Sequence, residues 1–150
     1  MILDKRLMLA DAQAVTATAI SSVIDLGMGA APYNTLTDIG GGEPMVALVT
    51  VKEAATAAGA ATVAFSLESD STADLATSAT VHAATAAIGK ATLALGYQFA
   101  IALPSAKTYE RFVGLRFTVA TGPLTAGKFD VNLIRASDLQ NSIPFKGAPL

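Results

Sequence analysis

Side chains capable of acid–base, nucleophilic or metal chemistry are few in this sequence of 150 residues, and they form no recognisable catalytic motif. There is one histidine, His82, and no cysteine, so a catalytic triad or a histidine-based metal site would have to include His82. Asp70 and Asp74 are close enough in sequence to approach one calcium ion, but they fit no EF-hand spacing. We therefore expect a structural role for His82, a solvated loop around the two aspartates, no cofactor, no metal and no catalysis.

The glycine-rich stretch between residues 27 and 44 gives no convincing nucleotide site. The Gly-Met-Gly run at 27–29 approaches a dinucleotide fingerprint, but Pro32 follows where that motif needs a helix N-terminus. The glycines at 40–42 are not followed by the Gly-Lys-Ser/Thr sequence that a phosphate-binding loop would need. We predict a long surface loop, a class of segment that is often functional. The acidic residues that flank this loop could approach one another as a pair, although their spacing favours ordinary solvation: Asp25, Asp38 and Glu43.

Three consecutive runs alternate apolar and small or polar residues with a period of two, which is typical of half-buried strands. They cover residues 97–103, 113–119 and 128–133. Turn residues separate them, so we predict an antiparallel meander with one buried face. Tyr97 is expected on that face. Arg111 and Arg116 are expected to pair with Glu110 or Asp130 of neighbouring strands.

Further strands are predicted earlier in the chain, at 23–26, 45–52 and 62–68, with weaker signals at 80–82, 88 and 92–95. The segment 45–52 is apolar on both faces, which indicates a central strand or one covered by a partner. The Ala-rich segment 54–61 is expected to be a turn or a short helix. The predicted core contains Val63, Phe65, Leu67, Phe99, Ile101, Val113, Leu115, Phe117, Val131 and Leu133.

Many short strands without a long helical period predict an all-β fold, a β-sandwich or jelly roll, formed as a single domain over residues 1–150. Residues 1–22 differ in composition from the rest. They fit either a first edge strand with a linker or an arm that docks on another molecule. Residues 142–150 are expected to be an extended tail because they contain prolines and show no period.

Composition narrows the function. The chain is 52% hydrophobic but only 6% aromatic, and its formal charge of −2 gives no basic surface for nucleic acid. No apolar run is long enough for a membrane span, and Asp11 interrupts the early apolar run that a signal peptide would need. We expect synthesis in the cytoplasm, with no nucleic-acid and no membrane partner.

Several short stretches, in order, carry a resemblance to one protein family. They are Asp4 to Thr16, Val23 to Gly27, Phe65 to Ser69, Leu103-Pro104, Glu110 to Phe117 and Gly122 to Gly127. In this order they resemble the Bbp16-type capsid cement proteins of tailed bacteriophages, from the N-terminus to about Asn141. The Ala-rich segments 54–61 and 83–91 depart from the pattern.

The resemblance implies a jelly-roll decoration protein on the outer surface of a phage head, bridging major capsid proteins and associating with itself as a dimer or trimer. Large apolar residues in the termini and the 27–44 loop are the candidates for capsid contact: Ile2, Leu3, Leu7, Met8, Met28, Tyr33, Pro144 and Phe145. Two other classes stay open. A carbohydrate- or receptor-binding jelly roll of a virion would need an aromatic platform, and a cupin-like enzyme would need several histidine or carboxylate ligands.

Overall fold

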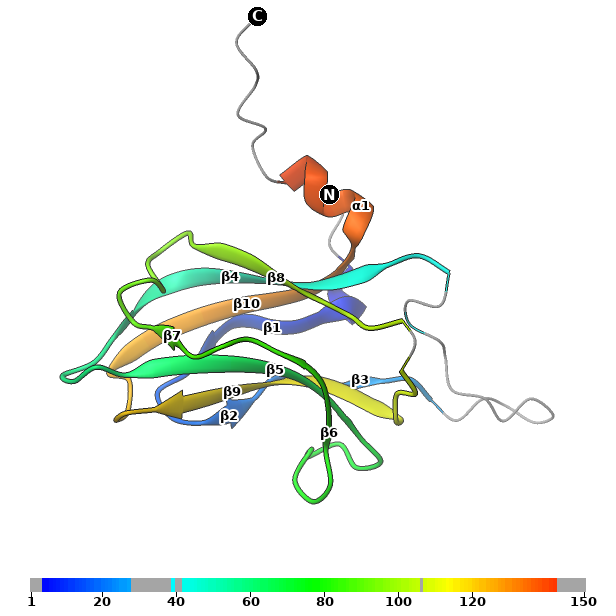
Figure 1. Ribbon diagram of the computed structural model, residues 1–150, viewed down its shortest axis with the longest axis horizontal. Coiled ribbons are helices and arrows are strands. Elements are labelled where there is room, and N and C mark those ends of the chain that lie inside the picture. Colours follow the sequence, from blue (N-terminus) through cyan, green and yellow to red (C-terminus); the bar gives the residue numbers. More distant parts are fainter. Residues whose placement is uncertain (1–3, 28–38, 40–41, 106, 143–150) are drawn as a thin grey trace, which may run out of the picture.

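The computed structural model describes residues 4–27, 39, 42–105 and 107–142, and it places them in two antiparallel sheets packed as a sandwich (Figure 1). Sheet A has the order β1 (Met8–Ala14), β10 (Ala126–Arg135), β4 (Met45–Thr56) and β8 (Gln98–Ala102). In sheet B, β9 (Phe112–Ala120) pairs with β2 (Ala19–Ile20) and β3 (Ile24–Asp25) on one side and with β5 (Thr62–Asp70) on the other. β5 also pairs with β6 (Thr80–Ala84) and β7 (Ile88–Gly89). The all-β sandwich is therefore confirmed.

The pairings are nested along the chain. β1 pairs with β10, β2 and β3 pair with β9, β4 pairs with β8, and β5 pairs with β6 and β7. The described chain therefore resembles one long hairpin folded over on itself. The jelly-roll connectivity stays a prediction, and the nested pairing supports it.

The predicted meander is wrong. β8 and β10 both pair with β4 in sheet A, whereas β9 lies in sheet B between β5 and the short strands β2 and β3. Alternation places the correct side chains inside, but it does not encode which strands are neighbours. The prediction that residues 45–52 form a central strand is confirmed by the position of β4.

The core lies between the two sheets and has an aromatic centre. The ring of Phe65 on β5 contacts the rings of Phe99, Phe117 and Phe129, all in edge-on geometry, with centroids 5.0, 5.6 and 5.4 Å away. Every predicted core residue is buried except Phe99, which is half-buried and packs against the core. Tyr97 was expected inside, but it is 37% exposed because it precedes β8 at the edge of sheet A.

Two segments differ locally from their predictions. Residues 54–56 continue β4, so the Ala-rich segment is a strand followed by a tight turn into β5. Residues 92–95 form a turn after β7, in which the N–H groups of Thr92 and Leu93 donate to Gly89 O. Leu93 is nevertheless fully buried, which explains its strand-like signal.

Both ends of the described chain lie against sheet A. Residues 5–7 form a 3-10 turn, η1 (Lys5–Leu7), which leads into the edge strand β1. At the other end the helix α1 (Ala136–Ser142) follows β10 and was not predicted; it includes Ser142, which we assigned to an extended tail. Leu139 of α1 covers Val46, Leu48 and Ile134 on the outer face of sheet A.

Candidate functional site

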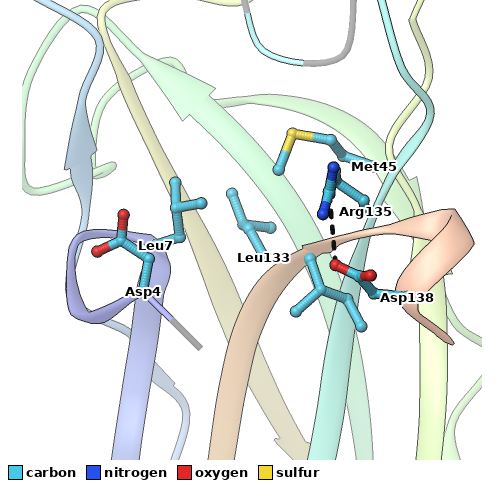
Figure 2. Close-up of a pocket in the computed structure, with 7 residues that line it drawn as sticks. Asp4, Leu7, Met45, Leu133, Arg135 and Asp138 are labelled. Carbon is cyan, nitrogen blue, oxygen red and sulfur yellow. Dashed lines mark hydrogen bonds and ion pairs between the residues drawn. The ribbon is translucent and has the colours of Figure 1, made fainter. Parts of the chain in front are cut away.

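A hollow of about 380 Å³ opens at one end of the sandwich, where η1, the start of β4, the end of β10 and α1 meet (Figure 2). Its lining combines an apolar floor with a charged rim. The lining residues are Asp4, Leu7, Met45, Leu133, Ile134, Arg135 and Asp138.

On the η1 side, a capped turn holds the wall of the hollow in place. The side chain of Asp4 accepts a hydrogen bond from the N–H of Arg6 at 2.9 Å, and the carbonyl of Asp4 accepts one from Leu7 N at 2.9 Å. An aspartate at this position satisfies N–H groups that would otherwise have no partner. The turn therefore directs Leu7, which is half-buried, onto the edge of the main core.

On the α1 side, a small ionic network forms the rim. Arg135 contacts Asp138 at 3.3 Å and Glu43 at 3.7 Å, and Glu43 also accepts a hydrogen bond from the hydroxyl of Ser137 at 2.6 Å. The pairs are solvent-exposed and add little to stability. Their effect is positional, because they fix the end of the 27–44 loop against the first turn of α1.

The lining of this hollow suits the binding of a partner group. Leu133 and Ile134 are almost fully buried in its floor, and the carboxylate of Asp138 is paired with Arg135. Among the described residues, its lining contains no hydroxyl, thiol or imidazole. Such a surface suits an apolar side chain of a partner, with charged groups at the rim to select its orientation.

Of the predicted contact residues, the structure describes Leu7 and Met8. Leu7 lines the hollow of Figure 2. Met8 lines a second hollow of about 340 Å³, which lies between β1 and the residues Ser22 and Val23. The other candidates lie outside the described residues: Ile2, Leu3, Met28, Tyr33, Pro144 and Phe145.

His82 lines neither hollow; it is half-buried on β6, at the edge of sheet B. Its Nε2 is 2.7 Å from the hydroxyl of Ser69, which is fully buried. Burial lowers the pKa of His82 below its usual 6.5, and the charge of Lys107 acts in the same direction, against the weaker opposing effect of Glu110. A buried serine cannot be reached by a substrate, so these two side chains form no accessible nucleophile.

Asp74 lies in the predicted loop, but Asp70 is the last residue of β5 and is not solvated. Asp70 is 1% exposed, and its Oδ1 accepts hydrogen bonds from the side chain of Ser71 and the N–H of Thr72, each at 3.2 Å. Asp74 is exposed and accepts a hydrogen bond from the Thr72 hydroxyl at 2.7 Å. Within the described ranges, no group of three or more potential metal ligands gathers.

The expected ion-pair partners of the arginines are wrong. Arg111 forms a two-bond pair with Asp25, at 2.8 and 2.9 Å, which ties β3 to the start of β9. Arg116 pairs with Glu68 at 2.8 Å on the outer face of sheet B. Because Asp25 and Glu43 are held by different partners at the two ends of the 27–44 loop, they do not form a carboxylate pair; Asp38 lies outside the described residues.

Most of the residues around the hollow could not be recognised as site residues from the sequence. Met45 and Leu133 were assigned to strands, and Arg135 and Asp138 were assigned no role. An acidic residue three positions after Arg135 is compatible with a helical turn, but seven residues are too few for a helical period to be recognised.

Two comparisons bear on identity. Residues 9–133 match the protein-family model described as Bbp16, a span that runs from β1 to near the end of β10. No curated protein matches the chain. None of the helices in the described part is long and apolar enough to cross a membrane.

Proposed function

The chain belongs to the Bbp16 family, and from this membership we propose that it is a cement protein of a tailed-phage capsid. In this role it binds the outer surface of the head and joins neighbouring copies of the major capsid protein. The observation that carries the proposal is the family match over residues 9–133. The match includes both sheets, so it concerns the body of the protein and not a peripheral segment.

The fold suits a protein that transmits mechanical load between the subunits of a shell. The ring of Phe65 contacts aromatic residues from both sheets, and the turn from β9 to β10 is short. A rigid body loses little conformational freedom when it binds. Weak contacts are then multiplied, because a symmetric shell presents the same site many times and a bridging molecule makes its second contact intramolecularly.

The hollow of Figure 2 is the proposed centre of the capsid contact. Asp4, at the start of the described chain, and Asp138 of α1 line it, and Glu43, at the end of the 27–44 loop, contacts the lining residue Arg135. Burying one apolar partner side chain on Leu133 and Met45 contributes roughly 1.5–3 kcal/mol before ordering costs. The predicted contact residues of the termini and the loop extend this surface.

The proposed role needs no catalysis. The hydrogen bond of His82 to a buried serine and the pairing of Glu68, Asp25 and Asp138 with arginines support a structural use of the titratable side chains. Association of the protein with itself on the shell, as a dimer or trimer, is part of the same proposal because capsid sites are related by symmetry.

Binding to purified phage heads that lack the cement protein tests the proposal. Wild-type protein should cosediment with the heads and raise their dissociation temperature, and no binding would refute the cement role. Arg135→Glu, which reverses a charge at the rim of the hollow, should reduce occupancy several-fold.

Lys128→Glu is the matched control. Lys128 lies on the same strand β10, forms an exposed ion pair with Glu53, and should tolerate charge reversal without loss of binding. If Arg135→Glu binds like wild type while the wild-type protein binds well, the cement role stands and the location of the contact is wrong.

One observation favours a carbohydrate-binding role as the second candidate. Tyr97 is exposed, and its ring packs against that of Phe99 with centroids 5.8 Å apart and planes tilted by 39°, which gives the edge of β8 an aromatic surface. Binding on a glycan array that Tyr97→Ala abolishes would favour this alternative. Capsid binding by Tyr97→Ala at the wild-type level would leave the cement proposal unaffected.

A further inference from the structure

The one histidine of the chain connects three segments at the β6 edge of sheet B. His82 is on β6, and its Nε2 is 2.7 Å from the Oγ of Ser69 on the neighbouring strand β5. The same Oγ accepts a hydrogen bond at 3.0 Å from the backbone N–H of Glu110, in the segment 107–111 that leads into β9. A single buried hydroxyl thus links β5, β6 and the 107–111 segment.

The direction of these bonds fixes the protonation state of the imidazole. Ser69 is fully buried, so its hydroxyl proton needs an acceptor inside the protein. Among the described residues, its hydrogen-bond partners are the Glu110 N–H, which can only donate, and His82 Nε2. The hydroxyl therefore donates to Nε2, and the neutral imidazole carries its proton on Nδ1.

Packing around the imidazole ring of His82 also holds the 107–111 segment to β6. The rings of His82 and Tyr109 have centroids 4.3 Å apart with planes at 39°, and Tyr109 is 7% exposed. The Tyr109 hydroxyl donates to Pro104 O at 2.9 Å, and the Thr80 hydroxyl of β6 donates to Glu110 at 3.1 Å. The 107–111 segment is therefore held to the edge of β6 by contacts centred on His82.

The charged groups near the imidazole are few. Lys107 and Glu110 act on His82 from the 107–111 segment, together with the neutral Tyr109. On β5, the charged residues next to Ser69 have partners other than the imidazole. Glu68 pairs with Arg116, and the carboxylate of Asp70 accepts a hydrogen bond from the N–H of Thr72. β8, which contacts β6, contains no titratable residue.

We propose that Ser69, His82 and Tyr109 form a pH-sensitive latch, which holds the 107–111 segment against β6 while the imidazole is neutral and releases it when Nε2 is protonated. A protonated Nε2 is a donor and cannot accept the Ser69 hydroxyl, whose proton is then left without a partner in a buried site. Protonation also places a cation near the positive charge of Lys107. The proposal does not depend on the capsid role.

The size of the effect follows from linkage. In the released state the histidine titrates near its ordinary pKa of 6.5. Between pH 7.5 and 5.0 the equilibrium for opening is therefore expected to rise by up to about 30-fold, because protons bind the open state preferentially.

Two measurements test the latch. Because His82 is the only histidine, its side-chain nitrogen signals in NMR are unambiguous, and at pH 7.5 they should show the proton on Nδ1. Amide hydrogen exchange in residues 107–111 and 80–84, corrected for the intrinsic effect of pH, should accelerate by up to about 30-fold between pH 7.5 and 5.0. The midpoint of that acceleration should follow the titration of His82.

The matched variant is His82→Gln, whose amide oxygen can accept the Ser69 hydroxyl but does not titrate. Exchange in 107–111 should then lose its dependence on pH. The same acceleration in His82→Gln as in wild type would overturn the latch. A proton on Nε2 at pH 7.5 in the wild-type protein would also overturn it, and that result can be obtained even if the variant does not fold.

Discussion

The ring of Phe65 packs edge-on against the ring of Phe99, with centroids 5.0 Å apart and planes at 73°. Phe65 lies on β5 in sheet B and Phe99 on β8 in sheet A, so this contact joins the two layers of the sandwich. Phe117 from sheet B and Phe129 from sheet A complete the cluster. In a chain that is only 6% aromatic, these four rings fill the centre of the core.

Phe117→Ala should lower the free energy of unfolding by about 3–5 kcal/mol, because a fully buried ring is replaced by a cavity. Urea or guanidinium melts provide the measurement. Tyr97→Ala is the control and should cost much less, since that ring is 37% exposed. A loss below about 1 kcal/mol for Phe117→Ala would show that the core is assigned incorrectly.

Gly114→Ala should destabilise the protein by about 1–3 kcal/mol through overpacking. An added Cβ would lie 2.8 Å from Cδ1 of Leu75 and 3.1 Å from Cγ1 of Val23. Leu75 is fully buried and lies in the loop between β5 and β6. In a Leu75→Ala background, the added cost of Gly114→Ala should shrink, and a double-mutant cycle measures the difference. Strictly additive effects would show that the two positions are not in contact.

Arg116→Met should cost roughly 2–4 kcal/mol in the same melts. Glu68 is 4% exposed and would lose the guanidinium that compensates its charge, which leaves, among the described residues, the Ser66 hydroxyl at 2.6 Å as its partner. The side chain of Arg116 is 28% exposed, so the cost should fall below that of a fully buried pair. Adding Glu68→Gln to Arg116→Met should recover part of the stability. If it recovers none, the charge of Glu68 is not the source of the loss.

Asp70 should make stability fall in acid. Burial alone would raise the pKa of Asp70, but hydrogen bonds from the N–H groups of Thr72 and Ser78 and from Ser71 outweigh it and hold the pKa below its usual 3.8. A carboxyl whose folded pKa is lowered stabilises the fold above its unfolded pKa, and this contribution is lost as the pH falls through the folded pKa. Asp70→Asn should therefore flatten the dependence of stability on pH below about 4. Equal slopes for the two proteins in melts from pH 5 to pH 2.5 would contradict this.

Deleting residues 2–9 should prevent stable folding. Leu9 is fully buried and β1 pairs with β10, so the deletion removes part of an integral edge strand. Deleting Ile2 and Leu3 alone should leave the circular dichroism and melting temperature nearly unchanged while reducing capsid occupancy, if these residues act as an arm. Wild-type occupancy of the shorter deletion would limit the capsid contact to the described part of the chain.

The sequence by itself determined most of the side chains that lie inside. Period-two alternation identified Val63, Phe65 and Leu67 on one strand and Val113, Leu115 and Phe117 on another, and the structure buries all of them. The turn chemistry was also readable, because Thr121 and Gly122 adopt the positive φ values of 62° and 102° that a tight turn between β9 and β10 requires. Family membership was recognisable from short ordered stretches, and the family match confirms it.

Only the tertiary structure decided which strands are neighbours and which charges pair. The alternating pattern shows that a residue faces the core. The pattern does not change with the neighbouring strand, which can come next in the sequence or from the other end of the chain. Phe99 and Phe117 therefore appeared to belong to one sheet, although they lie in different sheets and both contact Phe65. Arg116 could not be assigned to Glu68 for the same reason, because a cross-strand partner is defined by register, which is set by the packing of the whole sandwich. The hollow beside Leu7 depends most on this long-range order, since it exists only where segments from positions 4, 45 and 135 come together.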